Sequence, residues 1–146
     1  MNPPSASRRP GRRVALVACY PLRDAAMPQQ FISNHGMRMV EASLRAAGLE
    51  DLELRVWDLL HTSVESLEQE LVAFDPDVVG FSAYLWSFPF FVEVARRIKR
   101  QDPSRCVVFG GPSARPSMLG LGPFVEARRW IDALVINEAR TASWRS

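Results

Sequence analysis

The 146-residue chain carries 18 lysines and arginines against 16 aspartates and glutamates, and 47% of its residues are hydrophobic. This composition predicts one globular domain and excludes wholesale disorder. The sequence has no apolar run of the roughly 18 residues that a membrane span needs, and it begins without a hydrophobic secretory leader. We therefore expect a cytoplasmic protein that contacts no membrane.

The amino terminus is basic and lacks acidic residues. Its positive charge comes from four arginines: Arg8, Arg9, Arg12 and Arg13. A basic tail can contact nucleic acid or anionic lipid, but one rich in proline and glycine is also typical of a solvated, disordered leader. We predict such a disordered tail over residues 1–12, and no nucleic-acid partner.

The first half of the chain predicts two strands and one helix. Residues 13–20 (RVALVACY) form the first strand, and a polar loop follows. Residues 35–47 form a helix with Asn34 as its N-cap and Gly48 as its C-cap. Residues 52–57 alternate between apolar and polar, which is typical of an edge strand. The helix has an expected apolar face made of Met37, Met39, Val40, Ala42, Leu44 and Ala46.

The middle of the chain continues the alternation of strands and helices. Helices are predicted over residues 63–74 and 88–101, because apolar residues recur there at helical spacing. Strands are predicted over residues 77–83 and 105–109. Both strands contain an all-apolar stretch, VVGF at 78–81 and CVVF at 106–109, which favours burial on both faces, as in a parallel sheet with helices on either side.

A looser helix over residues 119–129 and a fifth strand over residues 131–136 complete the pattern. This order predicts an α/β fold with a doubly wound, five-stranded parallel sheet of the flavodoxin-like, Rossmann-like kind. Residues 13–138 would form the domain, and 139–146 a short C-terminal tail. Because that tail is too short for a normal helix, we expect the closing helix to be short or missing and another chain or domain to cover the exposed sheet face.

Small and polar residues follow two of the buried strands. Ser82 precedes the aromatic residues Tyr84 and Trp86, and a Gly-Gly-Pro turn occupies residues 110–112. Ligands of open parallel sheets bind beyond the carboxyl ends of the strands, and glycine lets a ligand approach the backbone. Two alternatives to a ligand site remain. Residues 110–112 could form only a tight turn between elements, and Tyr84 and Trp86 could belong to a core or an interface.

Common catalytic and cofactor motifs are missing from the sequence. It contains no Gly-Lys-Ser/Thr phosphate loop and no G-x-G-x-x-G, and the residues around Ser82 lack the second glycine of a nucleophile elbow. His35 and His61 have no carboxylate at a spacing that makes a triad or a metal site. Cys19 and Cys106 would lie at opposite edges of the sheet, so we expect buried structural thiols without a disulfide.

Several segments together resemble the N-terminal cobalamin-binding domain of cobalamin-dependent radical S-adenosylmethionine enzymes. The resemblance covers about residues 13–138. It rests on four segments: 39–48 (MVEASLRAAG), 75–86 (DPDVVGFSAYLW), 107–112 (VVFGGP) and 132–136 (DALVI). Each segment alone is a weak indicator of this family. The four segments at this spacing are a more specific one.

The resemblance implies a cobalamin lying across the carboxyl edge of the sheet, with its nucleotide tail against the turns after the third and fourth strands. The loop at residues 21–28 would face the corrin. Related mutases have an Asp-x-His-x-x-Gly motif there, and this loop has no histidine, so no protein histidine is expected on cobalt. The implied cofactor-binding residues are Pro21, Leu22, Ser82, Ala83, Tyr84, Trp86, Gly110, Gly111, Pro112, Asn137 and Glu138.

The chain departs from the family at two points. Asn137-Glu138-Ala139-Arg140 replaces the usual Gly-Glu-Gly-Glu, and the Cys-x-x-x-Cys-x-x-Cys motif of the radical domain is absent. We therefore expect a cobalamin-binding module that is not catalytic alone, with no catalytic or metal-ligating residue of its own, and that works with a radical S-adenosylmethionine protein or domain. The alternatives are a non-functional truncated remnant and a small flavodoxin-like enzyme of unrelated chemistry.

Overall fold

The computed structural model describes residues 12–19, 34–59 and 62–136. In this part of the chain, parallel strands form one sheet in the order β2-β1-β3-β4-β5, which confirms the predicted flavodoxin-like topology. The strands are β1 Arg12–Cys19, β2 Leu52–Leu59, β3 Val78–Ser82, β4 Cys106–Gly110 and β5 Ala133–Leu134. The helices are α1 His35–Ala46, α2 Val64–Phe74, α3 Phe88–Gln101 and the 3₁₀ segments η1 Met118–Gly120 and η2 Gly122–Arg129.

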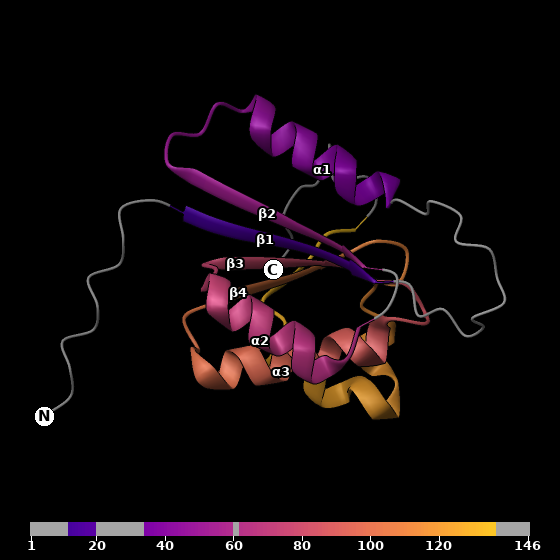
Figure 1. The fold of residues 1–146 in the computed structure, drawn as a ribbon. Helices are drawn as coiled ribbons and strands as arrows, with labels where there is room; N and C mark the ends of the chain where they lie inside the picture. Colours follow the sequence, from indigo (N-terminus) through magenta and orange to yellow (C-terminus); the bar gives the residue numbers. More distant parts are fainter. Residues whose placement is uncertain (1–11, 20–33, 60–61, 137–146) are drawn as a thin grey trace, which may run out of the picture.

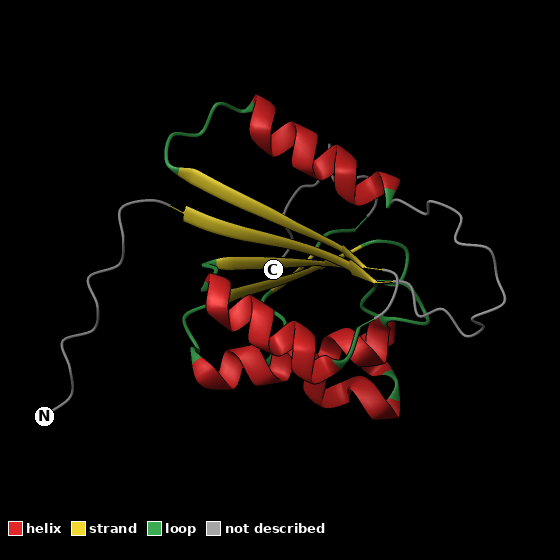
Figure 2. Ribbon diagram, in the orientation of Figure 1, coloured by secondary structure: helices red, strands yellow, loops and turns green. Residues whose placement is uncertain are grey.

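Helices lie on both sides of the sheet. Figure 1 shows α1 above β2 and β1, with α2 and α3 below the sheet. Colouring by secondary structure makes the same layers visible, with the yellow strands between red helices (Figure 2). The predicted edge position of β2 is confirmed, because among the described strands β2 pairs with β1 alone.

The lower face of the sheet carries the main hydrophobic core. Alternate residues of the central strands point into it, and the Phe81 ring lies 4.8 Å from Phe91 and 5.3 Å from Phe109 between ring centroids. From α3 the core takes Phe88, Phe91, Val94, Ala95 and Ile98. Each such large apolar side chain contributes about 1.5–3 kcal/mol when it is fully buried.

Helix α1 covers part of the upper face. The Asn34 side chain caps it by accepting a hydrogen bond from the Met37 backbone, as predicted, and Gly48 follows the last turn with φ 61°. Met37, Val40 and Leu44 pack with Leu16 and Ala18 of β1 and with residues of β2. The expected apolar face was too broad: Met39 is half-buried, and Ala42 and Ala46 are exposed.

The prediction that β3 is buried on both faces is wrong. Val79 and Phe81 are buried, whereas Val78, Gly80 and Ser82 are only half-buried. The reason is the position of α1, which packs on β1 and β2 and does not extend over β3. In β4 the prediction holds for the three middle residues and fails at the two ends.

The carboxyl-terminal elements differ from their predicted form. The segment expected as a loose helix over 119–129 forms two 3₁₀ pieces, η1 and η2. Gly120 and Gly122 disfavour a continuous α-helix, and Pro123 lacks the N–H group that such a helix would use. The strand expected over 131–136 pairs with β4 only through Ala133 and Leu134.

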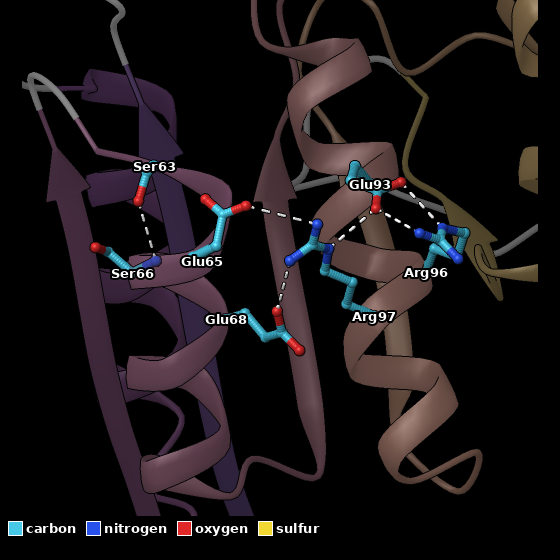
Figure 3. Close-up of polar contacts among 7 residues, drawn as sticks. All are labelled: Ser63, Glu65, Ser66, Glu68, Glu93, Arg96 and Arg97. Carbon is cyan, nitrogen blue, oxygen red and sulfur yellow. Dashed lines mark hydrogen bonds and ion pairs between the residues drawn. The ribbon is translucent and has the colours of Figure 1, made fainter.

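Ion pairs join the outer surfaces of α2 and α3 (Figure 3). Arg97 of α3 reaches Glu65 and Glu68 of α2 and also Glu93 one turn away on its own helix. Glu93 pairs with Arg96 as well. Hydrogen bonds from Arg96, and then from Arg97, lower the pKa of the Glu93 carboxyl to about 2.

This shift predicts a pH dependence of stability. Because the folded pKa of Glu93 is below its ordinary value of 4.5, its contribution is present above about pH 4.5 and is lost as the pH falls toward 2. Between pH 6 and pH 3, wild type should therefore lose about 0.5–1 kcal/mol more unfolding free energy than Glu93→Gln, the value expected of a solvent-screened pair. Urea unfolding at both pH values measures this, with the exposed Glu70→Gln as control; equal losses in Glu93→Gln and wild type would contradict it.

Candidate functional site

The turns that follow β3 and β4 meet at the carboxyl edge of the sheet. Ser82 is the register partner of Gly110. Beyond this pair, the Ala83 backbone N–H donates to the Gly110 carbonyl at 2.7 Å, and the Ser113 N–H donates to the Ala83 carbonyl at 3.1 Å. The two segments that the sequence singles out are therefore hydrogen-bonded neighbours.

Gly111 has a packing role in this junction. Its φ is 89°, and a Cβ atom built there would lie 2.7 Å from the Ala83 carbonyl oxygen and 3.0 Å from the Ala83 nitrogen. No L side chain fits that space without moving backbone. The tight-turn interpretation of the Gly-Gly-Pro segment is thus correct for Gly111, while Pro112 is exposed at the rim. Ala83 is fully buried in the main core.

Small residues line the upper face of the sheet beside α1. Register places Gly80 next to Val108 and Val108 next to Ala133, and it places Ser82 next to Gly110. A Cβ on Gly110 would lie 3.8 Å from the Cβ of Val135, an ordinary contact. We call this surface the sheet floor; it consists of Gly80, Ser82, Val108, Gly110, Ala133 and Val135.

The sheet floor has no covering helix among the described residues. Helix α1 packs over β1 and β2, and the other helical segments pack into the core on the lower face. Figure 1 shows this asymmetry, with α1 reaching only one side of the upper face. The result is an apolar, small-residue surface that opens at the carboxyl edge.

An aromatic loop stands next to this edge. The rings of Tyr84 and Trp86 stack with centroids 4.7 Å apart and planes 11° apart. Trp86 is 49% exposed and Leu85 is 71% exposed, so these two side chains lie outside the core. The buried Ser87 hydroxyl accepts a hydrogen bond from the Tyr84 backbone N–H at 3.0 Å and thereby fixes the shape of the loop.

A buried asparagine joins α1 to the site. Asn34 is 1% exposed, and its Nδ2 donates to Ser82 Oγ at 3.0 Å and to Tyr84 Oη at 3.2 Å. Its backbone N–H donates to Asp58 Oδ2 at 3.3 Å. From the sequence Asn34 was predicted only as a helix cap, because residue spacing carries no sign of contacts 48 and 50 positions away.

Two aspartates of the resembling segments act at the opposite, amino edge. Asp77 accepts a hydrogen bond from the Arg13 backbone N–H at 2.9 Å. Asp132 accepts one from the Val107 N–H at 2.7 Å and pairs with Lys99. These carboxylates tie neighbouring strands together and lie away from the strand ends that form the site.

Both cysteines are unpaired, as predicted, but only Cys19 is fully buried, and Cys106 is half-buried. Burial raises the pKa of the Cys19 thiol to about 11, which keeps it protonated and unreactive at neutral pH. Burial also raises the pKa of Cys106.

Part of the predicted site lies outside the described residues, namely Pro21, Leu22, Asn137 and Glu138. His61 lies there too, whereas His35 is exposed at the start of α1. Within the described ranges, no group of three or more His, Cys, Asp or Glu side chains could hold a metal ion. No helix there is long and apolar enough to cross a membrane.

The fold is an open parallel sheet of the kind that binds ligands at its carboxyl edge, and comparison with known families gives the class of domain. Residues 25–142 match the B12 binding domain family, so the chain belongs to that family. It is 40% identical over 70 residues to the 2-(S-pantetheinyl)-carbapenam-3-carboxylate methyltransferase of Streptantibioticus cattleyicolor. It is 36% identical over 70 residues to the cobalamin-dependent radical SAM methyltransferase TokK of Streptomyces tokunonensis.

Both matches cover 47% of this chain and about a tenth of the relative. Among solved structures, a cobalamin-binding protein from Desulfitobacterium hafniense has the same fold. The TM-score is 0.59 at 15% identity, over 88% of this chain and 54% of that one. The predicted resemblance to the cobalamin-binding module of radical S-adenosylmethionine methyltransferases is thus confirmed.

The close approach at Gly111 generates a stability prediction. Gly111→Ala should destabilise the fold by about 2–3 kcal/mol, because it adds a strained positive φ and a clash with the Ala83 backbone. Gly120→Ala is the matched control, since a Cβ atom there meets nothing within 4 Å. Urea unfolding of both variants measures the difference; equal stability would show that the junction relaxes freely.

Proposed function

We propose that this domain binds cobalamin at the carboxyl edge of its sheet, with the nucleotide tail of the cofactor lying on the sheet floor. The observation that carries the proposal is that none of the described helices covers the floor. The floor consists mostly of small residues and lies beside the paired turns after β3 and β4. The residues present therefore fit a flat heterocycle at the end of such a tail, with the Ser82 hydroxyl available for a polar contact.

Each part of the site has a distinct proposed role. Gly80 and Gly110 have no side chains, so a ligand can approach the backbone of β3 and β4 closely. Ser82 supplies a hydroxyl at the end of the floor. Tyr84 and Trp86 supply a stacked, partly exposed aromatic surface against which a macrocycle can pack. Gly111 and Ala83 hold the two turns together.

The remaining site residues are proposed from the resemblance. Pro21 and Leu22 would lie below the corrin, and Pro112, Asn137 and Glu138 would border the tail. A bound cobalamin would supply a cobalt centre able to carry an organic group. This chain's own residues would bind and orient the cofactor and shield it from water, and none of those described is arranged as a nucleophile with its base.

The reaction would depend on a partner. The chain spans about a tenth of the length of the two curated relatives, which are methyltransferases. We propose that a radical S-adenosylmethionine protein or domain, bearing the iron–sulfur cysteines that this sequence lacks, uses the cobalamin held here.

Cofactor retention tests the proposed site. Purified protein mixed with hydroxocobalamin and desalted should keep the visible absorbance of the corrin. Gly110→Leu should reduce retention at least about tenfold, because a side chain would then fill the floor. Gly120→Leu, an open position on η1, is the control.

The outcomes separate the alternatives. Loss of all corrin absorbance from folded wild-type protein would reject a cofactor function and favour a non-functional remnant or an enzyme of unrelated chemistry. Full retention by Gly110→Leu would show that the cofactor binds elsewhere on the domain.

Cobalt ligation is a separate prediction. We expect no protein histidine on cobalt, since the loop at 21–28 contains none. The chain has two histidines, so the double variant His35→Ala, His61→Ala removes both. Visible spectra and electron paramagnetic resonance spectra of the bound Co(II) cofactor should superimpose for wild type and this variant. A changed nitrogen splitting in the variant would identify a histidine ligand.

A further inference from the structure

Asn34 contacts α1 and the candidate site at the same time. Its Oδ1 accepts a hydrogen bond from the Met37 backbone N–H at 2.9 Å. Its Nδ2 donates to the Ser82 and Tyr84 hydroxyls, at 3.0 and 3.2 Å. A side-chain amide has one acceptor oxygen and two N–H donors, so these three bonds engage the oxygen and use both donors.

The helix cap fixes the orientation of this amide. The N–H group of Met37 can only donate, so the oxygen of Asn34 must face α1 and its NH₂ must face the hydroxyls. The oxygen and nitrogen of an asparagine are assigned from such a network, and here the network allows only one assignment. Ser82 Oγ is therefore an acceptor toward Asn34.

A hydroxyl that accepts from one side keeps its own proton for another partner. Among the described residues, no acceptor is assigned to the Ser82 O–H, and Ser82 is half-buried on the sheet floor beside Gly110. The direction of the Asn34 bond thus leaves the Ser82 proton to be donated over the floor.

We propose that Asn34 is a positioning residue that presents the Ser82 hydroxyl to the ligand as a hydrogen-bond donor. This inference rests on the proposed cobalamin site and deepens it. It selects a ligand atom that accepts, such as an uncharged ring nitrogen or an amide carbonyl, both of which cobalamin carries, over one that donates. Asn34 also makes the start of α1 and the floor one hydrogen-bonded unit.

Two substitutions separate this role from helix capping. Asp and Ser cap helices about as well as Asn, so Asn34→Asp and Asn34→Ser should keep α1. Neither offers an NH₂ group to Ser82. In Asn34→Asp the carboxylate would accept from Ser82 and turn its proton away from the floor. Asn34→Ser avoids placing a second negative charge beside Asp58 and provides the test if the aspartate variant fails to fold.

Hydroxocobalamin titration, followed by absorbance, measures the effect. Both Asn34 variants should raise the Kd at least about tenfold, the scale of one lost hydrogen bond to a buried partner. Ser82→Ala should raise it similarly. The double variant Asn34→Ser, Ser82→Ala should be no worse than Ser82→Ala alone, because both changes remove the same interaction. Ser63→Asp, at the N-cap of α2, should leave the Kd unchanged.

Circular dichroism and thermal unfolding of every variant give the structural readout. An unchanged Kd in both Asn34 variants, while wild type binds, would overturn this inference and leave the proposed function intact. Additive losses in the double variant would also overturn it, because they would mean that Asn34 acts only through the stability of α1. Failure of wild type to bind would overturn the proposed function and this inference with it.

Discussion

The domain depends on one tightly packed interface, the lower face of the central strands against α2 and α3. Phe81 of β3 packs against both Phe109 of β4 and Phe91 of α3, and all three are essentially inaccessible to solvent. This interface fixes the register of β1, β3 and β4 from one side alone. Because stability comes mainly from that side, the upper face can remain partly open without loss of the fold.

Two local constraints shape the part of the upper face that no described helix covers. Gly111 lets the turn after β4 rest directly on the backbone of Ala83, which aligns the two strand ends. Asn34 then joins the start of α1 to Ser82 and so borders the floor on the other side. Packing on one face, a glycine at the edge and an asparagine at the helix cap together define a shallow surface with few polar groups.

Sequence patterns predicted the strand and helix order and the cap at Asn34, because these depend on local periodicity and capping chemistry. They failed where distant elements decide the outcome. Continuous apolar residues in β3 suggested two covered faces, yet α1 packs elsewhere. The motif aspartates, Asp77 among them, proved to join strands at the edge opposite the site.

By itself the sequence determined the class of fold, the family, and the two strand-end segments that border the candidate site. Each of these depends on patterns of residues that are close together along the chain. Only the tertiary structure decided which face of the sheet the described helices leave uncovered, why Gly111 must be glycine, and that Asn34 donates a hydrogen bond to Ser82. Each of these depends on groups brought together from separate elements, and residue spacing carries no record of such contacts.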